Sequence, residues 1–221
     1  MTHDKAPTSQ PGWSALADEQ GMPVNDVEEH YRNIAGYFSE TLCITWCQGL
    51  TLDEVAGVFG SGLDTGLRYN VAEAENAGFE AREEAGGVAC SAMAGQLGPW
   101  VVVVEPEYGD TGSGHETLRE LSAKDGRALN VYSGVNSHSL DYYRDARPLT
   151  TLQFLEWGEE PFHRQGDQPH LLDDLIGDFS GERAADFRAF ALAVAERLTG
   201  VRLTHDWLFS KHRWLRWEDW D

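Results

Sequence analysis

The sequence has 221 residues, of which 41% are hydrophobic and 11% aromatic, so one domain with a sizeable core is expected. Its 37 acidic and 17 basic residues give a formal net charge of −20, a field that repels phosphate backbones and anionic membranes. This charge argues against nucleic acid and membranes as partners. It favours a protein partner with a basic surface, unless it serves solubility alone.

Residues 1–24 are rich in Pro, Ser, Thr, Gly and acidic side chains, a composition typical of a flexible N-terminal arm. The arm lacks an apolar stretch of signal-peptide length, and the longest apolar run, 100–104, is too short to span a bilayer. We therefore expect a cytoplasmic protein. Residues 25–208 are predicted to form a single domain, followed by a Trp-rich C-terminal extension at 209–221.

A helix is predicted over 27–48, because apolar side chains recur there at a spacing of four. These side chains are Ile34, Phe38, Leu42 and Trp46. Gly49 suits the position after the last helical turn, and Thr51 with Glu54 forms a capping box that opens a short second helix.

The middle of the sequence is predicted to consist mainly of strands. Residues 66–104 look extended, and the apolar run at 100–104 predicts a central strand covered on both faces. A short helix is expected over 115–123. Three further strands, joined by short polar turns, are predicted as an antiparallel meander at 127–135, 139–145 and 149–157.

Helices return near the end, with a short one at 171–176 and a longer one at 182–198 that carries an apolar stripe. Because strands do not alternate strictly with helices, we expect an α+β fold. In this fold an antiparallel sheet, a meander, packs with N- and C-terminal helices.

The most glycine-rich loop, 109–114, precedes a predicted helix and could in principle hold a phosphate. It contains no Lys or Arg, Asp110 opposes an anion, and neither nucleotide-binding fingerprint is present. Asp110-Thr111-Gly112 also matches the short core of an aspartic protease. The catalytic dyad of such a protease needs a second such loop on a matching half or on a second chain, and the surroundings here are not those of a β-barrel. A plain loop is the favoured interpretation.

Cys43 and Cys47 could be half of a zinc site, yet no second pair of suitable spacing completes it. His163 and His170 lie near acidic residues in a polar loop without matching a metal signature, and Cys90 would need a neighbouring histidine to act as a nucleophile. The sequence therefore gives no catalytic residue, no metal ligand and no cofactor. It favours a non-enzymatic protein while leaving an enzyme open.

The C-terminal segment is the most unusual in composition, with tryptophans at a spacing of three interleaved with arginines. The candidate partner-binding residues are Trp207, Trp214, Arg216, Trp217 and Trp220. Alternatively, the indoles cover the core of the domain, or they mediate self-association. Stacking on single-stranded nucleic acid is opposed by the net charge.

A second hypothesis is a small-molecule-binding protein or enzyme whose site lies on the meander and its turns. The candidate residues for this site are Tyr132, Asn136, His138, Tyr142 and Arg144.

Five segments together resemble an uncharacterised actinobacterial family, domain-of-unknown-function family 6461. They are FSETLCITWCQGLTLDEV (38–55), WVVVVEP (100–106), LRELS (118–122), VYSGVN (131–136) and ALAVAERLTGVRLT (191–204). The resemblance spans roughly residues 30–208 and implies a bacterial, cytoplasmic, single-domain protein without an established activity. By association with small acidic proteins of this kind, it favours a protein-binding module, immunity- or antitoxin-like or regulatory.

Overall fold

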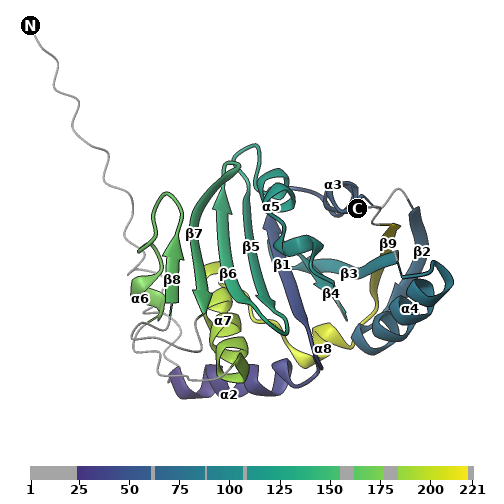
Figure 1. Cartoon of the computed structure of the whole chain (residues 1–221), viewed down its shortest axis with the longest axis horizontal. Helices are drawn as coiled ribbons and strands as arrows, with labels where there is room; N and C mark the ends of the chain where they lie inside the picture. The colour runs from purple at the N-terminus through teal and green to yellow at the C-terminus, as the bar shows by residue number, and fades with distance from the viewer. Residues whose placement is uncertain are drawn as a thin grey trace, which may run out of the picture.

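The computed structural model describes residues 24–60, 63–87, 89–106, 109–154, 162–176 and 184–218 (Figure 1). Its strands are β1 (Leu42–Gln48), β2 (Leu63–Tyr69), β3 (Ala89–Leu97), β4 (Trp100–Glu105), β5 (Arg127–Ser133), β6 (His138–Arg144), β7 (Arg147–Phe154), β8 (Phe162–Gln165) and β9 (His212–Glu218). Its helices are α2 (Val24–Ala35), α3 (Leu52–Val58), α4 (Val71–Glu84), the 3-10 turn η1 (Thr111–Ser113), α5 (His115–Leu121), α6 (Asp173–Ile176), α7 (Ala184–Thr199) and α8 (His205–Leu208).

Within these residues the strands form one sheet in the order β2-β9-β3-β4-β1-β5-β6-β7-β8, with antiparallel pairing throughout. The predicted α+β class is confirmed. The meander of β5, β6 and β7 is confirmed as well, and β4 is buried along its whole length, as the apolar run at 100–104 predicted.

Helices cover both faces of the sheet. On the first face, α2 and α7 pack against each other and, with α4, against side chains such as Trp46 and Leu129 (Figure 1). On the second face, α3 and α5 cover a smaller apolar cluster that includes Phe59 and Tyr143. Successive residues of a strand therefore alternate between two distinct environments.

The helix predicted over 27–48 is wrong beyond Ala35. The chain leaves α2 at Gly36 and forms β1, the strand that lies between β4 and β5. Leu42 to Cys47 are all buried, since both faces of β1 are covered. A strand covered on both sides reads as a continuous apolar run, and such a run satisfies a helical spacing of four by coincidence.

The stretch 66–104, expected to be extended, contains the helix α4. Its N-cap is Asn70, whose side chain accepts from the backbone N–H of Glu73 at 3.0 Å while the Glu73 carboxylate accepts from the N–H of Asn70 at 2.9 Å. This reciprocal capping box is visible in the sequence as Asn-x-x-Glu and is the signal that would have revealed the helix.

The Trp-rich segment 209–221, predicted as an extension outside the domain, supplies a strand of the sheet. β9 pairs with β3 on one side and β2 on the other. Alternation along β9 sends Trp214 to the first face and Trp217 to the second, where both are buried. The predicted arm, residues 1–24, lies outside the described residues except for Val24, the first residue of α2.

Among the helices that the structure describes, none is long and apolar enough to cross a membrane.

Candidate functional site

The β6–β7 hairpin carries the most distinctive polar groups on the first face. Its two-residue turn, Asp145-Ala146, has positive φ angles of 52° and 59°, the backbone of a tight hairpin turn of the type that matches strand twist. The turn places Arg144 directly opposite Arg147 in the register, and on the other side of β6 Arg127 lies opposite Arg144. Three arginines therefore occupy neighbouring positions on three adjacent strands.

This arginine row is poorly neutralised. Like charges directly opposite on a sheet are destabilising. Arg144 has an ion pair with Asp145 at 3.5 Å and Arg147 one with Asp167 at 3.8 Å, both between side chains that are at least 44% exposed. Exposed ion pairs at such distances contribute little stabilising free energy. Within the described part of the chain, Arg127 has no ion pair at all, so positive charge is concentrated here in a chain of net charge −20.

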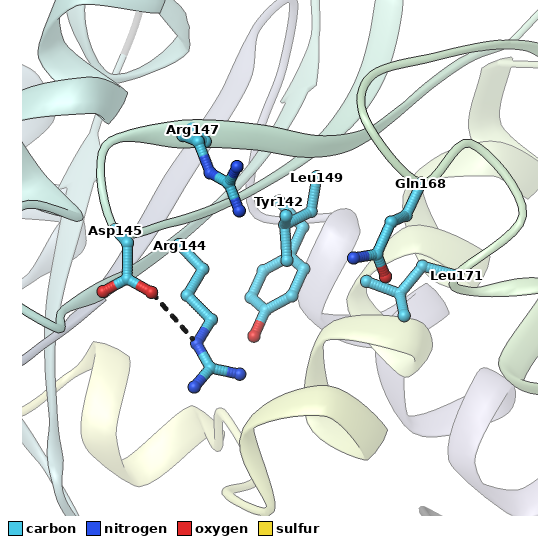
Figure 2. Close-up of a pocket in the computed structure, with 7 residues that line it drawn as sticks. All are labelled: Tyr142, Arg144, Asp145, Arg147, Leu149, Gln168 and Leu171. Carbon is cyan, nitrogen blue, oxygen red and sulfur yellow. Dashed lines mark ion pairs between the residues drawn. The ribbon is translucent and has the colours of Figure 1, made fainter. Parts of the chain in front are cut away.

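A pocket of about 230 Å³ opens beside this row (Figure 2). Figure 2 shows the guanidinium groups of Arg144 and Arg147 on one side of the Tyr142 ring, with Gln168 and Leu171 on the other. The residues that line the pocket, called here the arginine pocket, are Tyr142, Arg144, Asp145, Arg147, Leu149, Gln168 and Leu171.

The Tyr142 hydroxyl stays protonated at neutral pH. Burial raises the pKa of Tyr142, the positive charges of Arg127 and Arg144 lower it, and Asp145 raises it further, with a net upward shift. A protonated phenol can donate a hydrogen bond, as the guanidinium groups do. The polar lining therefore contains the donors that an anionic group requires, alongside the Asp145 carboxylate, which pairs with Arg144.

The far wall of the pocket is fixed to the sheet by backbone hydrogen bonds. The N–H of Gln168 donates to the carbonyl of Leu149 at 2.7 Å, and that of Asp167 donates to Pro148 at 3.0 Å. Gly166 permits this approach, because it has φ +107° and an added Cβ would lie 2.6 Å from the Leu149 carbonyl oxygen. The pocket is thus formed before any ligand arrives.

Of the five residues predicted for a small-molecule site, the structure brings only Tyr142 and Arg144 together. Tyr132 lies on the second face, in register with Cys43 and Ser139. Asn136 is exposed in the β5–β6 turn, and His138 is buried at the other end of β6 with Ser133 Oγ at 2.9 Å from its ring. These three positions do not contribute to the arginine pocket.

Sequence reasoning missed Arg147, Gln168 and Leu171. Arg147 could have been found, since a two-residue hairpin turn at 145–146 must place residue 147 opposite Arg144. The loop residues could not, because their position depends on contacts with β7 that no local pattern reveals.

The tryptophans predicted to bind a partner lie mostly in the interior. Trp207 is 9% exposed, and Trp214 and Trp217 are each 6% exposed. Arg216 lies 4.0 Å from Glu84, and Trp220 lies outside the described residues. Burial of these indoles favours the alternative interpretation, in which they cover the core of the domain.

The other motifs considered from the sequence have simple surroundings. Cys43 and Cys47 lie on the second face of β1, and Cys47 donates to the Leu121 carbonyl at 3.2 Å. His163 is exposed on β8, while the ring of His170 lies 2.9 Å from Asp173. No cluster of three potential metal-ligating side chains is found in the described ranges.

Comparison with known families gives one match over most of the chain. A family model described as a family of unknown function, DUF6461, covers residues 29–213. Searches of curated proteins and of solved structures found no match.

Proposed function

Because the chain belongs to this family of unknown function, DUF6461, which brings no assigned activity, we propose a function from its geometry: binding of a small molecule through a carboxylate or phosphate group in the arginine pocket. The observation that carries the proposal is the cross-strand row of Arg127, Arg144 and Arg147. Arg144 and Arg147 line the pocket together with Asp145, and Arg127 lies opposite Arg144 in the register. This gathering of arginines in a strongly acidic chain supports the binding of an anion.

The lining supports a ligand that is partly apolar. The guanidinium groups of Arg144 and Arg147 and the hydroxyl of Tyr142 supply donors, whereas Leu149 and Leu171 offer aliphatic surface. The volume of about 230 Å³ is below the range of roughly 300–1,000 Å³ that is common for drug-sized ligands. A metabolite-sized anion with a short carbon skeleton fits these features.

Amide NMR titrations with sodium succinate and, separately, inorganic phosphate at matched ionic strength test the proposal. We expect saturable shifts in residues 142–149 and 166–171, and the arm that saturates at lower concentration identifies the preferred group. Arg144→Gln should weaken binding by about 10-fold or more, the loss of one charge-assisted contact.

The matched control is Arg119→Gln, which removes the same charge from an exposed position on α5. Binding should be nearly unchanged in this variant. Shifts scattered over the whole surface, or an equal loss in both variants, would count against the pocket.

A second candidate function is binding of a basic protein partner, supported by the net charge of −20. An immunity-like or regulatory role, a cytoplasmic location and an actinobacterial origin belong to this second proposal. Self-association through Trp214 and Trp217 would require these buried indoles to become exposed. Affinity capture from the native host at low and high salt tests it. A specific partner should be retained at low salt and released at high salt, and recovery of no specific partner at either salt concentration would remove its support.

A further inference from the structure

A buried polar cluster lies on the second face of the sheet, away from the arginine pocket. In the register, Cys43 of β1 is opposite Glu105 of β4, and Thr45 of β1 is opposite Asn130 of β5. All four side chains are at most 1% exposed. A carboxyl group buried to this extent is unusual unless its hydrogen bonds are satisfied.

The glycine-rich loop 109–114 supplies hydrogen bonds to the buried Glu105 carboxyl group. The Glu105 carboxyl accepts from the backbone N–H of Gly112 at 2.7 Å and of Thr111 at 3.0 Å, and the Cys43 thiol lies 3.2 Å from the same group. Next to it, Asn130 Nδ2 donates to Thr45 Oγ1 at 2.9 Å, whereas Asn130 Oδ1 has no partner among the described groups.

The loop lies so close to the cluster that side chains are excluded. A Cβ on Gly112 would be 2.3 Å from Thr45 Oγ1, and one on Gly109 would be 2.5 Å from Glu105 Cβ. The backbone of the loop therefore covers Glu105 directly, while Asp110 and Gly114 on either side of η1 are exposed. The unusual glycine content has a structural reason that does not involve phosphate.

We propose that residues 109–114 form a lid over Glu105, and that closing of this lid is coupled to the uptake of one proton by the Glu105 carboxyl. In the open state the carboxyl is hydrated and the Cys43 thiol is accessible. In the closed state both are sealed from water by the loop backbone.

The balance of forces on the carboxyl sets the direction of the coupling. Burial raises the pKa of Glu105 from 4.5 to about 7, and Asp110 raises it as well, although the N–H groups of Gly112 and Thr111 and the thiol of Cys43 lower it. Among the described residues, the titratable groups that face it are Cys43 on β1, Asp110 in the lid and Tyr132 on β5. Burial raises the pKa of both Cys43 and Tyr132, so these two stay neutral near pH 7.

A group whose pKa is higher in the closed state than in the open state favours closing when it is protonated. The closed lid is therefore most stable below about pH 4.5 and loses stability as the pH rises through about 7. With a tenfold change for each pH unit between those two values, the ratio of open to closed lid rises by up to about 300-fold.

Amide hydrogen exchange of the full chain between pH 5.5 and 8.5, corrected for chemical exchange, measures lid opening. We expect the protection of Thr111 and Gly112 to fall by about 30-fold over this pH range, because part of the full change occurs below pH 5.5, while amides in the middle of β1 keep their protection. Labelling by an alkylating reagent, read by mass spectrometry, should rise faster with pH at Cys43 than at Cys47, which is buried outside the lid.

Two further measurements complete the test. Glu105→Gln should remove the pH dependence between pH 6 and 8, whereas Asp110→Asn should keep it. If Glu105→Gln does not fold, a carbon-13 titration of the Glu105 carboxyl in the unmodified protein decides. The proposal would be overturned if the Glu105 carboxyl titrates near pH 4.5, or if the protection of the Thr111 and Gly112 amides from exchange does not change with pH.

Discussion

Replacing Gly112 by alanine tests whether the lid is packed directly on the sheet. Gly112 has no positive φ, so the backbone conformation itself is open to alanine, and the added Cβ is the only new feature. That Cβ would lie 2.3 Å from Thr45 Oγ1 and 2.7 Å from Glu105 Oε1, both closer than real contacts. The loop must move away, which strains or breaks the 2.7 Å hydrogen bond from its N–H. We expect a loss of unfolding free energy of about 1–3 kcal/mol, typical of overpacking.

The assay is urea unfolding of Gly112→Ala, Thr45→Ala and the double variant. Removing Thr45 Oγ1 opens space for the new methyl group, so the double variant should recover part of the loss, with a coupling of about 1 kcal/mol. Gly57→Ala in α3 is the control, because its Cβ would meet nothing within 4 Å. If Gly112→Ala is as mild as this control, the lid does not contact the sheet as described, and the reasoning fails.

Three further outcomes follow from the structure. Because the folded state raises the pKa of Glu105 from 4.5 to about 7, the stability contributed by its protonation is complete below pH 4.5 and lost as the pH rises through 7. Between pH 4.5 and 8, the free energy of unfolding of the unmodified protein should fall by up to about 3 kcal/mol more than that of Glu105→Gln. If urea unfolding shows the same change with pH in both proteins, this expectation is contradicted. Trp217→Ala should cost about 3–5 kcal/mol, since Trp217 is 6% exposed and packs edge-on against Phe59, whereas Phe79→Ala, at a side chain 52% exposed, should stay within about 0.5 kcal/mol. Thermal melts that rank the two variants the other way would exclude an interior position for β9. Gly166→Ala should cost about 1–3 kcal/mol and weaken succinate or phosphate binding, because φ +107° and the nearby Leu149 carbonyl both oppose a side chain. Calorimetric titration showing unchanged affinity would mean that the 166–171 loop does not shape the pocket.

Local patterns predicted those parts of the fold whose contacts are close in sequence. The strands β5, β6 and β7 are joined by short turns, and α7 carries its own apolar stripe, so the sequence alone indicates them. The sequence of β1 predicts a helix because its buried apolar run fits the periodicities of both a helix and a strand. Local patterns do not reveal β9 as part of the domain, because its partners β2 and β3 lie more than a hundred residues earlier in the sequence.

The candidate sites also differ in whether their residues are close together or far apart in the sequence. Tyr142 and Arg144 lie two residues apart on β6 and so share a face, a proximity that the alternation of a strand indicates from the sequence alone. The cluster of Cys43 and Glu105 was not anticipated, since it depends on a β1–β4 register that joins residues 62 positions apart. Without that register, Glu105 is one of 37 acidic residues and nothing in its immediate sequence distinguishes it.

The place of β9 between β2 and β3 has a consequence for synthesis on the ribosome. Until His212–Glu218 has emerged, β3 keeps one edge unpaired and β2 has no neighbour in the sheet. Unpaired edges of apolar strands are sites of wrong association between chains. The nascent protein therefore holds an unfinished sheet until His212–Glu218 has been made, and β9 then joins β2 to the other described strands.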